Sequence, residues 1–163
     1  MLLKRLILRN FRNYVDALIP FKEGINVIQG ENGAGKTNLL EAIYLLSTGK
    51  SFRTSHLNDL IHKDASFFFI EAHFTKDHVD QKLSIGFDGI HRKVHYNGSS
   101  SHTFSHVLGI FPSVLYAPKD STLITGSPAE RRRFLNIQLA QTDPLYVCLL
   151  YTSDAADDSL RVD

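Results

Sequence analysis

The sequence predicts an α/β fold organised around a phosphate-binding loop, and three consecutive features of residues 24–46 carry this prediction. The apolar segment Gly24-Ile25-Asn26-Val27-Ile28-Gln29 is typical of a short buried strand. The next eight residues, Gly30-Glu31-Asn32-Gly33-Ala34-Gly35-Lys36-Thr37, fit the pattern G-x-x-x-x-G-K-[ST] at every fixed position. Residues 38–46 then follow an amphipathic helical pattern. A strand that turns through glycines into a helix is the setting that this motif requires.

The residue types of this loop suit a polyphosphate. Glycines at 30, 33 and 35 allow backbone conformations that are closed to residues with a Cβ, and they leave room for phosphate against the main chain. Successive N–H groups then form an anion nest, to which a helix beginning near Lys36 adds its unpaired donors and positive dipole end. We expect Lys36 to reach the β- and γ-phosphates and the Thr37 hydroxyl to ligate Mg²⁺.

Length and composition indicate an ordinary globular chain. It has 163 residues, of which 43% are hydrophobic and 21% charged, with a net charge of +1. No apolar run approaches the ~20 residues of a membrane span, and the charged N-terminus does not resemble a signal peptide. The single cysteine, Cys148, has no disulfide partner, which is typical of a reducing compartment. We therefore expect a cytoplasmic protein with no membrane contact.

The segments on either side of the loop predict antiparallel strands. Residues 2–9 and 15–21 have extended patterns, with Asn10-Phe11-Arg12-Asn13 as the turn of a hairpin. After the helix, Gly49 is a plausible C-cap. Three more strand candidates follow, with Asp88-Gly89 and Asn97-Gly98 as tight turns, and they predict a meander: residues 67–74, 82–87 and 92–96.

The C-terminal third of the chain has weaker signals. We expect a loop at Ser99-Ser100-Ser101, a short helix at 106–111 and a buried strand at 113–117. Ser127-Pro128-Ala129-Glu130 has the form of a capping box with proline at the first helical position, which predicts a helix to about Gln141. Residues 152–163 are small and acidic, as in a disordered tail.

The eight histidines do not indicate a metal site. His102 and His106 are four residues apart, as are His91 and His95. The second pair falls in a predicted strand, where this spacing separates the side chains by roughly 13 Å. No cluster of cysteines or carboxylates completes either pair, so we expect most histidines to lie on the surface.

The basic residues leave two interpretations open. Arg131-Arg132-Arg133 is either a solvated helix face or a contact for phosphate or a partner, because positive charge in a first helical turn is unfavourable. Basic residues also flank Phe11 and Phe52, a pattern that can bind nucleic acid. We favour a role for both phenylalanines as core anchors.

Three blocks of sequence resemble the RecF family of recombination mediators, which are SMC-like ABC ATPases of bacterial DNA repair. The first is Leu6-Ile7-Leu8-Arg9-Asn10-Phe11-Arg12-Asn13-Tyr14, and the second runs from Gly30 to Arg53. The third comprises residues 115–120 and 126–135. The blocks occur in order and cover residues 1–147.

This resemblance implies the N-terminal half of a P-loop ATPase head of the ABC/SMC type, with a mixed core sheet. Residues 1–126 would form its N-terminal lobe, including an antiparallel β segment at 67–97. Residues 127–147 would begin a helical lid, and residues 148–163 match nothing in the family. Because the resemblance stops near Val147, we expect a truncated or frame-shifted gene product or an assembly artefact, with residues 148–163 as a disordered or artefactual tail.

The resemblance also implies a function. Family members bind ATP with Mg²⁺, dimerise in an ATP-dependent way and bind single-stranded and gapped duplex DNA. With other recombination mediator proteins they support recombinase loading, recombinational repair, replication and the SOS response.

By position, Gly30 to Thr37 would bind the nucleotide, and Ala34, which replaces the usual glutamine, should not prevent this. Further nucleotide or DNA contacts are expected from five residues: Arg12, Asn13, Asp120, Arg131 and Arg132. Asp120 would substitute for the glutamine that related heads place near that position.

The resemblance implies that no residue of this chain is catalytic. Family members are longer, and both the ABC signature and the acidic Walker B strand lie in the part beyond this chain. Those parts supply the opposing γ-phosphate contact and the acid that positions water and metal. We therefore expect weak ATP binding and essentially no hydrolysis.

Two other functions are compatible with the loop motif. One is a P-loop kinase or small NTPase acting on a metabolite, which would need an acceptor pocket and a closing lid with arginines. The antiparallel segment 67–97 and the opening Phe11-Arg12-Asn13-Tyr14 favour the ABC/SMC type instead. The other is a nonfunctional fragment whose exposed half-core aggregates.

Overall fold

The computed structural model describes residues 1–101, 104–117, 126–143 and 145–146. The chain divides into two compact units, Met1–Val107 and Leu108–Asp163. No helix in the described ranges is both long enough and apolar enough to span a membrane.

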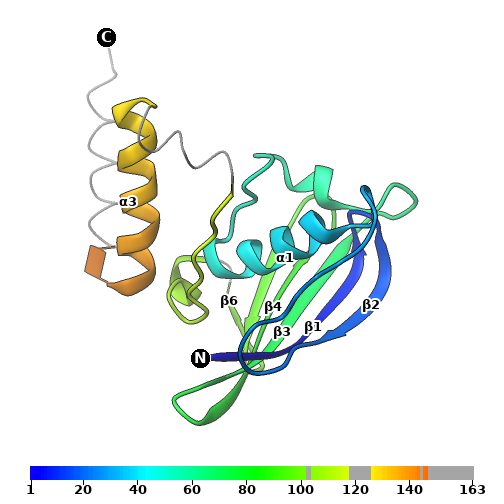
Figure 1. Cartoon of the computed structure of the whole chain (residues 1–163), viewed down its shortest axis with the longest axis horizontal. Helices are drawn as coiled ribbons and strands as arrows, with labels where there is room; N and C mark the ends of the chain where they lie inside the picture. The colour runs from blue at the N-terminus through cyan, green and yellow to red at the C-terminus, as the bar shows by residue number, and fades with distance from the viewer. Residues whose placement is uncertain (102–103, 118–125, 144, 147–163) are drawn as a thin grey trace. The chain divides into compact units, whose positions relative to one another are not determined.

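The first unit is built on one six-stranded sheet with α1 against it. The strand order is β2-β1-β3-β4-β5-β6, and every neighbouring pair is antiparallel. The elements are β1 (Leu2–Phe11), β2 (Tyr14–Pro20), α1 (Lys36–Thr48), β3 (Phe68–Lys76), β4 (Val79–Phe87), β5 (Arg92–Tyr96) and β6 (Ser99–Ser101), with 3₁₀ turns η1 (Leu57–Leu60) and η2 (Phe104–Val107). Figure 1 shows α1 lying across one face of the sheet.

Alternation along the strands gives the sheet an apolar face. Leu8, Ile70, Ile85 and Val94 lie opposite one another on neighbouring strands, and all four are fully buried. Side chains that are two residues apart on a strand share a face, so this row continues as a core along the whole sheet. The helix contributes its own apolar side to this core: Leu39, Ala42, Leu45 and Leu46.

The predicted hairpin, meander and first helix are confirmed. Gly49 ends α1 in the left-handed conformation, at φ 70°, and its N–H donates to the carbonyl of Leu45. The Asn97-Gly98 turn also forms with positive φ angles, and it joins β5 to β6. The expected loop at residues 99–101 is therefore wrong, because these serines pair with β5.

One tight turn contains no glycine and was not predicted from the sequence. Asp77 and His78 join β3 to β4 with φ angles of 52° and 62°. Asparagine, aspartate and histidine enter this region more readily than other residues with a Cβ. Strand β4 consequently begins at Val79, three residues before the predicted start at 82.

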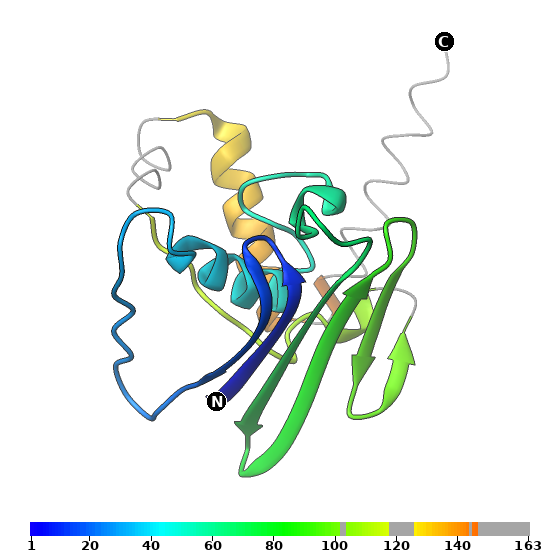
Figure 2. The ribbon, with the colours of Figure 1, turned by 90° about the vertical axis from the view of Figure 1, so that its right-hand side faces the viewer.

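The predicted buried strand at residues 24–29 is wrong. These residues form no strand, and Ile25 and Val27 are 94% and 72% exposed. Figure 2 shows the segment between β2 and α1 bowing away from the sheet. A strand needs a neighbour for its N–H and C=O groups, and none of the described strands pairs with these residues. The expected mixed sheet is corrected for the same reason, since the described sheet is wholly antiparallel.

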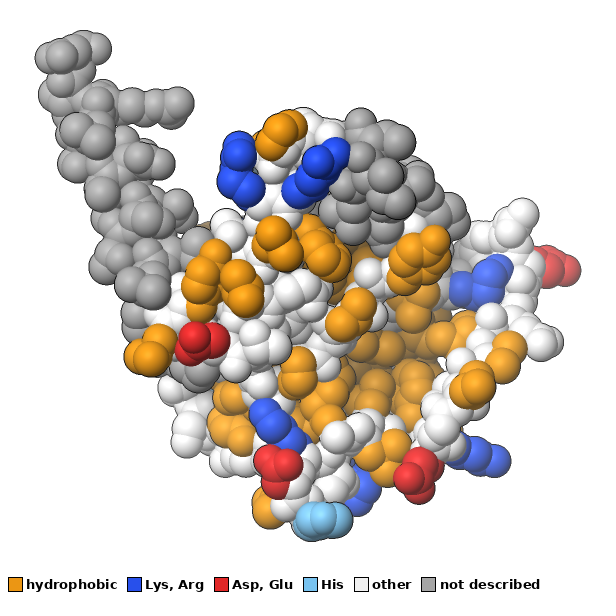
Figure 3. All heavy atoms as spheres, turned by 60° about the vertical axis from the view of Figure 1, so that its left-hand side comes forward, with side chains coloured by type: hydrophobic (Ala, Val, Ile, Leu, Met, Phe, Trp, Pro, Cys, Tyr) orange, Lys and Arg blue, Asp and Glu red, His pale blue; other side chains and the backbone are white. Residues whose placement is uncertain are grey.

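The second unit contains α3 (Pro128–Thr142), which confirms the helix predicted from the capping box. The expected helix at 106–111 is wrong. The 3₁₀ turn η2 ends at Val107, and Gly109 has a φ of +83° that a helix cannot continue. Residues 113–117 form no strand either, and Val114 is 77% exposed. Figure 3 shows exposed apolar side chains gathered on the face that it draws.

Replacing a central aromatic side chain should test the importance of the apolar face. Phe11 is fully buried, and its ring meets the ring of Phe68 edge-on at 5.5 Å between centroids. We expect Phe11→Ala to lower the free energy of unfolding by about 3–5 kcal/mol, because a large cavity remains. Leu18, on the exposed side of β2, is the control, and Leu18→Thr should change it by no more than about 0.5 kcal/mol. Urea denaturation measures both, and equal effects would contradict this account of the core.

Candidate phosphate-binding site

The loop Gly30–Thr37 leads directly into the N-terminus of α1. A turn between Glu31 and Ala34 closes with an N–H···O bond of 3.2 Å. Gly33 and Gly35 then adopt φ angles of 87° and 102°, and α1 begins at Lys36. No side chain caps this helix end and no acid lies in its first turn. Its unpaired N–H donors and positive dipole end are therefore available to an anion.

The ammonium group of Lys36 lies inside the loop. Its Nζ donates to the carbonyl oxygens of Gly30 at 2.6 Å and Glu31 at 2.8 Å. The Thr37 hydroxyl belongs to the first turn of α1, and this residue is exposed. The donor set of this loop, which combines a glycine turn, an ammonium group and an exposed hydroxyl, fits a polyphosphate with Mg²⁺. The structure thus brings together the predicted residues of the phosphate loop.

The turn between β1 and β2 packs directly on this loop. Gly35 has a φ of 102°, which strains any residue with a Cβ, and a Cβ built there would also lie 2.7 Å from the side-chain amide of Asn13. Asn38 donates from Nδ2 to Oδ1 of Asn13 at 2.8 Å. The Tyr14 hydroxyl donates to the carbonyl of Gly35 at 3.2 Å, and burial raises the pKa of this hydroxyl. The structure therefore places the predicted residue Asn13 against the phosphate loop.

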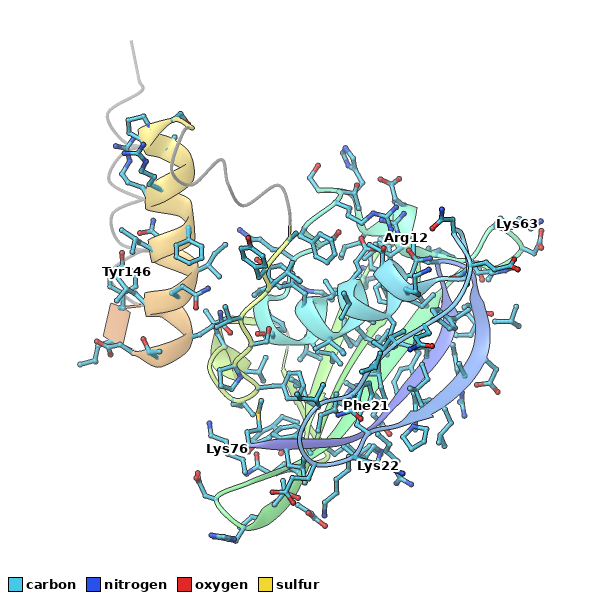
Figure 4. All side chains as sticks on the ribbon, in the orientation of Figure 1. Arg12, Phe21, Lys22, Lys63, Lys76 and Tyr146 are labelled. Atoms are coloured by element: carbon cyan, nitrogen blue, oxygen red, sulfur yellow. The ribbon has the colours of Figure 1, made fainter. Side chains whose placement is uncertain are left out.

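A buried carboxylate behind the loop was not predicted from the sequence. Glu41, on α1, is fully buried and accepts two hydrogen bonds from Arg12, from Nε at 3.0 Å and from Nη2 at 2.8 Å. It accepts two more, from Ser51 Oγ at 2.5 Å and Arg53 Nη1 at 3.2 Å. Figure 4 shows Arg12 beside the N-terminal end of α1. The structure therefore places the predicted residue Arg12 on Glu41, behind the loop.

The environment of Glu41 keeps it ionised. Burial alone raises the pKa of this carboxyl group. The hydrogen bonds from Arg12 and Ser51 and the positive charges of Arg12 and Arg53 outweigh that effect, so the pKa lies below its ordinary value. One signal in the sequence could have revealed this residue. Glu41 falls on the apolar side of the helical pattern, where an acid is rarely found without a partner.

The remaining predicted residues lie elsewhere or outside the described ranges. Asp120 falls outside the residues that the structure describes. Arg131 and Arg132 belong to the first turn of α3 in the second unit, and Arg132 is exposed. Within the described ranges, no three histidine, cysteine, aspartate or glutamate side chains gather in a way that could hold a metal ion.

Comparison with known proteins agrees with the fold and the loop. The family model described as RecF/RecN/SMC N terminal domain matches residues 2–109. The DNA replication and repair protein RecF of Protochlamydia amoebophila is 49% identical over 147 residues, which are 90% of this chain and 41% of the relative. RecF of Chlamydia abortus is 48% identical over 139 residues, 85% of this chain and 38% of the relative. The chain thus spans about two fifths of the length of these curated relatives.

Solved structures of other proteins share the fold of this chain. The recombination mediator protein RecF bound to ATP, from the RecFOR pathway, superposes with a TM-score of 0.86 at 34% identity, covering 92% of this chain and 41% of that one. A chain from work on ATP-driven dimerization and DNA stimulated activation of SMC ATPases superposes with a TM-score of 0.69 at 24% identity. It covers 84% of this chain and 99% of that one, and at this identity it shows the fold alone.

Fold and loop together define the N-terminal half of a P-loop ATPase head of the ABC/SMC type, with an antiparallel β subdomain. The chain belongs to the RecF/RecN/SMC family, and it corresponds to the N-terminal part of the RecF proteins.

The lowered pKa of Glu41 predicts a pH dependence of stability. Because the unfolded chain binds this proton more readily than the folded one, the stabilisation is fully present at neutral pH. It is lost as the pH falls below about 4.3, the ordinary value for glutamate, and through the lower folded value. We expect the free energy of unfolding of the wild type to fall more steeply between pH 5 and 3 than that of Glu41→Gln. Urea denaturation at several pH values measures this, and parallel pH profiles would contradict the assignment.

Proposed function

We propose that this chain is the nucleotide-binding part of an ATP-dependent DNA replication and repair protein of the RecF type. The observation that carries the proposal is the ammonium of Lys36, held inside a glycine loop at the uncapped N-terminus of α1. The similarity to a RecF structure bound to ATP supports ATP as the nucleotide. Family membership favours this function over a kinase acting on a metabolite.

Binding would exchange one set of hydrogen bonds for another. The Lys36 ammonium would leave the carbonyls of Gly30 and Glu31 and bond the β- and γ-phosphates. Backbone N–H groups of Gly35, Lys36 and Thr37 would hold the phosphate oxygens, since the first N–H groups of a helix have no partner within it. The Thr37 hydroxyl would ligate Mg²⁺, which neutralises charge on the phosphates when it is bound.

We propose that this chain alone does not turn ATP over. Phosphoryl transfer depends on positioning the attacking water and on neutralising charge around the γ-phosphate. The resemblance assigns both tasks to motifs that lie beyond the stretch shared with the relatives. The chain matches only 41% of a curated relative and of the RecF structure bound to ATP, which supports this proposal.

We propose that residues 22–29 form a strand only where further sequence of the family pairs with them. Every one of these residues is exposed, including the apolar Ile25, Val27 and Ile28. An apolar strand without a ladder partner leaves both its backbone groups and its side chains in water. Parallel strands supplied by the remaining part of a relative would cover it. Residues 1–126 and 127–147 would then act as the N-terminal lobe and the start of the lid.

The wider activity is proposed from relatives. ATP-driven dimerization and DNA-stimulated activation are attributes of the SMC ATPases that share this fold. We propose an ATP-dependent homodimer in the cytoplasm that binds single-stranded and gapped duplex DNA. It would act with other recombination mediators in recombinase loading and the SOS response. Arg131, Arg132 and Asp120 remain proposed contacts for nucleotide or DNA.

Replacing the loop lysine tests the proposed nucleotide site. We expect Lys36→Ala to weaken binding of Mg·ATP at least about tenfold, because the charge-assisted bonds to the phosphates are lost. Lys63→Ala is the matched control, since this lysine is exposed on a separate loop (Figure 4), and it should leave the affinity unchanged. Isothermal titration calorimetry measures both. Equal affinities for the two variants, or steady ATP hydrolysis by the wild-type chain, would contradict the proposal.

A further inference from the structure

We infer that Glu41 is a positioning residue for the phosphate loop, acting through Arg12 and the turn between β1 and β2. The side chain of Glu41 accepts hydrogen bonds from Arg12, Ser51 and Arg53, and none of these three residues belongs to the loop. The inference rests on the proposed function, because it concerns the same nucleotide site. A buried carboxylate would thus determine the shape of a binding loop that it does not touch.

Glu41 is the centre of a cluster of charged side chains. One fully buried carboxylate faces two guanidinium groups from separate segments, Arg12 after β1 and Arg53 after α1. Ser51 adds a hydroxyl donor, so the carboxylate accepts four hydrogen bonds. Bidentate contact with an arginine fixes orientation as well as distance. Glu41 therefore ties two other parts of the chain, the turn between β1 and β2 and residues 51–53, to the middle of α1.

The turn between β1 and β2, which contains Arg12, has an uncommon backbone conformation. Asn10 and Arg12 have φ angles of 50° and 54°, which residues with a Cβ adopt only where their surroundings enforce it. Arg12 donates from its backbone N–H to the carbonyl of Leu60 at 2.7 Å, and His62 donates to the carbonyl of Asn10 at 2.8 Å. The guanidinium of Arg12 also donates to the carbonyl of Asp59 at 2.7 Å. The hydrogen bonds from Arg12 to Glu41 add a further constraint on this turn, which comes from α1.

The turn between β1 and β2 contacts the phosphate loop directly. Asn13, the next residue after Arg12, fills the space where a Cβ on Gly35 would be, and Tyr14 bonds the Gly35 carbonyl. Arg53 donates to Asn38 Oδ1 at 2.7 Å, and Asn38 in turn donates to Asn13. Both arms of the cluster thus end on Asn13, which lies against Gly35, the residue just before α1. A shift of the turn would move Gly35 and the amides that follow it.

The chain offers a matched control for this carboxylate. Glu71 on β3 is also buried, at 7% exposure, and it pairs with two basic side chains, His73 at 2.7 Å and Lys82 at 3.1 Å. It lies on the polar face of the sheet, opposite the face that packs on α1, because its neighbour Ile70 is part of the apolar row. Glu71→Gln therefore removes a comparable buried charge without touching the turn or the loop.

The experiment compares wild type, Glu41→Gln and Glu71→Gln in the whole 163-residue chain. Hydrogen exchange measured by mass spectrometry, without nucleotide, reports the order of residues 30–38, and titration with a fluorescent ATP analogue and Mg²⁺ reports affinity. We expect Glu41→Gln to speed exchange of residues 30–38 and to weaken binding, each about tenfold. Glu71→Gln should leave both close to wild type, although both variants lose some thermal stability.

Each outcome decides one claim. Unchanged exchange at residues 30–38 in Glu41→Gln would overturn the positioning role, whatever the ATP affinity. Equal losses in Glu41→Gln and Glu71→Gln would also overturn it, because they would indicate general destabilisation. If the wild type binds no nucleotide while the exchange difference holds, the proposed function fails and the positioning of the loop stands. Should Glu41→Gln not fold, Ser51→Ala, which removes one bond to Glu41, must show a smaller shift in the same direction or the inference fails.

Discussion

The first unit is organised around one helix, α1, whose apolar side is buried while its N-terminal end has no side-chain cap. Helix α1 packs its apolar side on the apolar face of the sheet, and it contacts β1, β3 and β4. This packing fixes the helix axis, and therefore fixes the direction in which its unpaired N–H groups point. The glycine at position 35 lets the preceding loop turn back over those groups.

The two sides of the loop are supported very differently. On the side of the β1–β2 turn, Glu41 bonds Arg12, and the next two residues of the turn bond α1 and the loop: Asn13 accepts from Asn38, and Tyr14 donates to the Gly35 carbonyl. On the other side, residues 22–34 are exposed throughout, and apolar side chains face water. Burying such side chains contributes roughly 1.5–3 kcal/mol each. The exposed segment is therefore the part of the unit that gains most from a covering neighbour.

Local pattern was enough to predict the hairpin, the meander, α1 and the phosphate loop, because each is specified by residues that are close in sequence. The segments 24–29 and 113–117 were mispredicted as strands for the opposite reason. Their apolar patterns are strand-like, but a strand forms only when a partner supplies its ladder, and nothing local encodes that partner. Glu41 was missed because its role depends on arginines that are 29 and 12 residues away in the sequence. The turn at Asp77-His78 was missed because it uses no glycine.

The central claim is that the loop Gly30–Thr37 binds the phosphates of ATP. Its most direct test is a titration of the isotopically labelled chain with Mg·ATP, followed by backbone amide NMR shifts. The account predicts saturable shifts concentrated at Gly35, Lys36 and Thr37, because these amides would bond phosphate oxygens. Shifts that cluster away from this loop, or amides there that do not respond at saturating nucleotide, would contradict it.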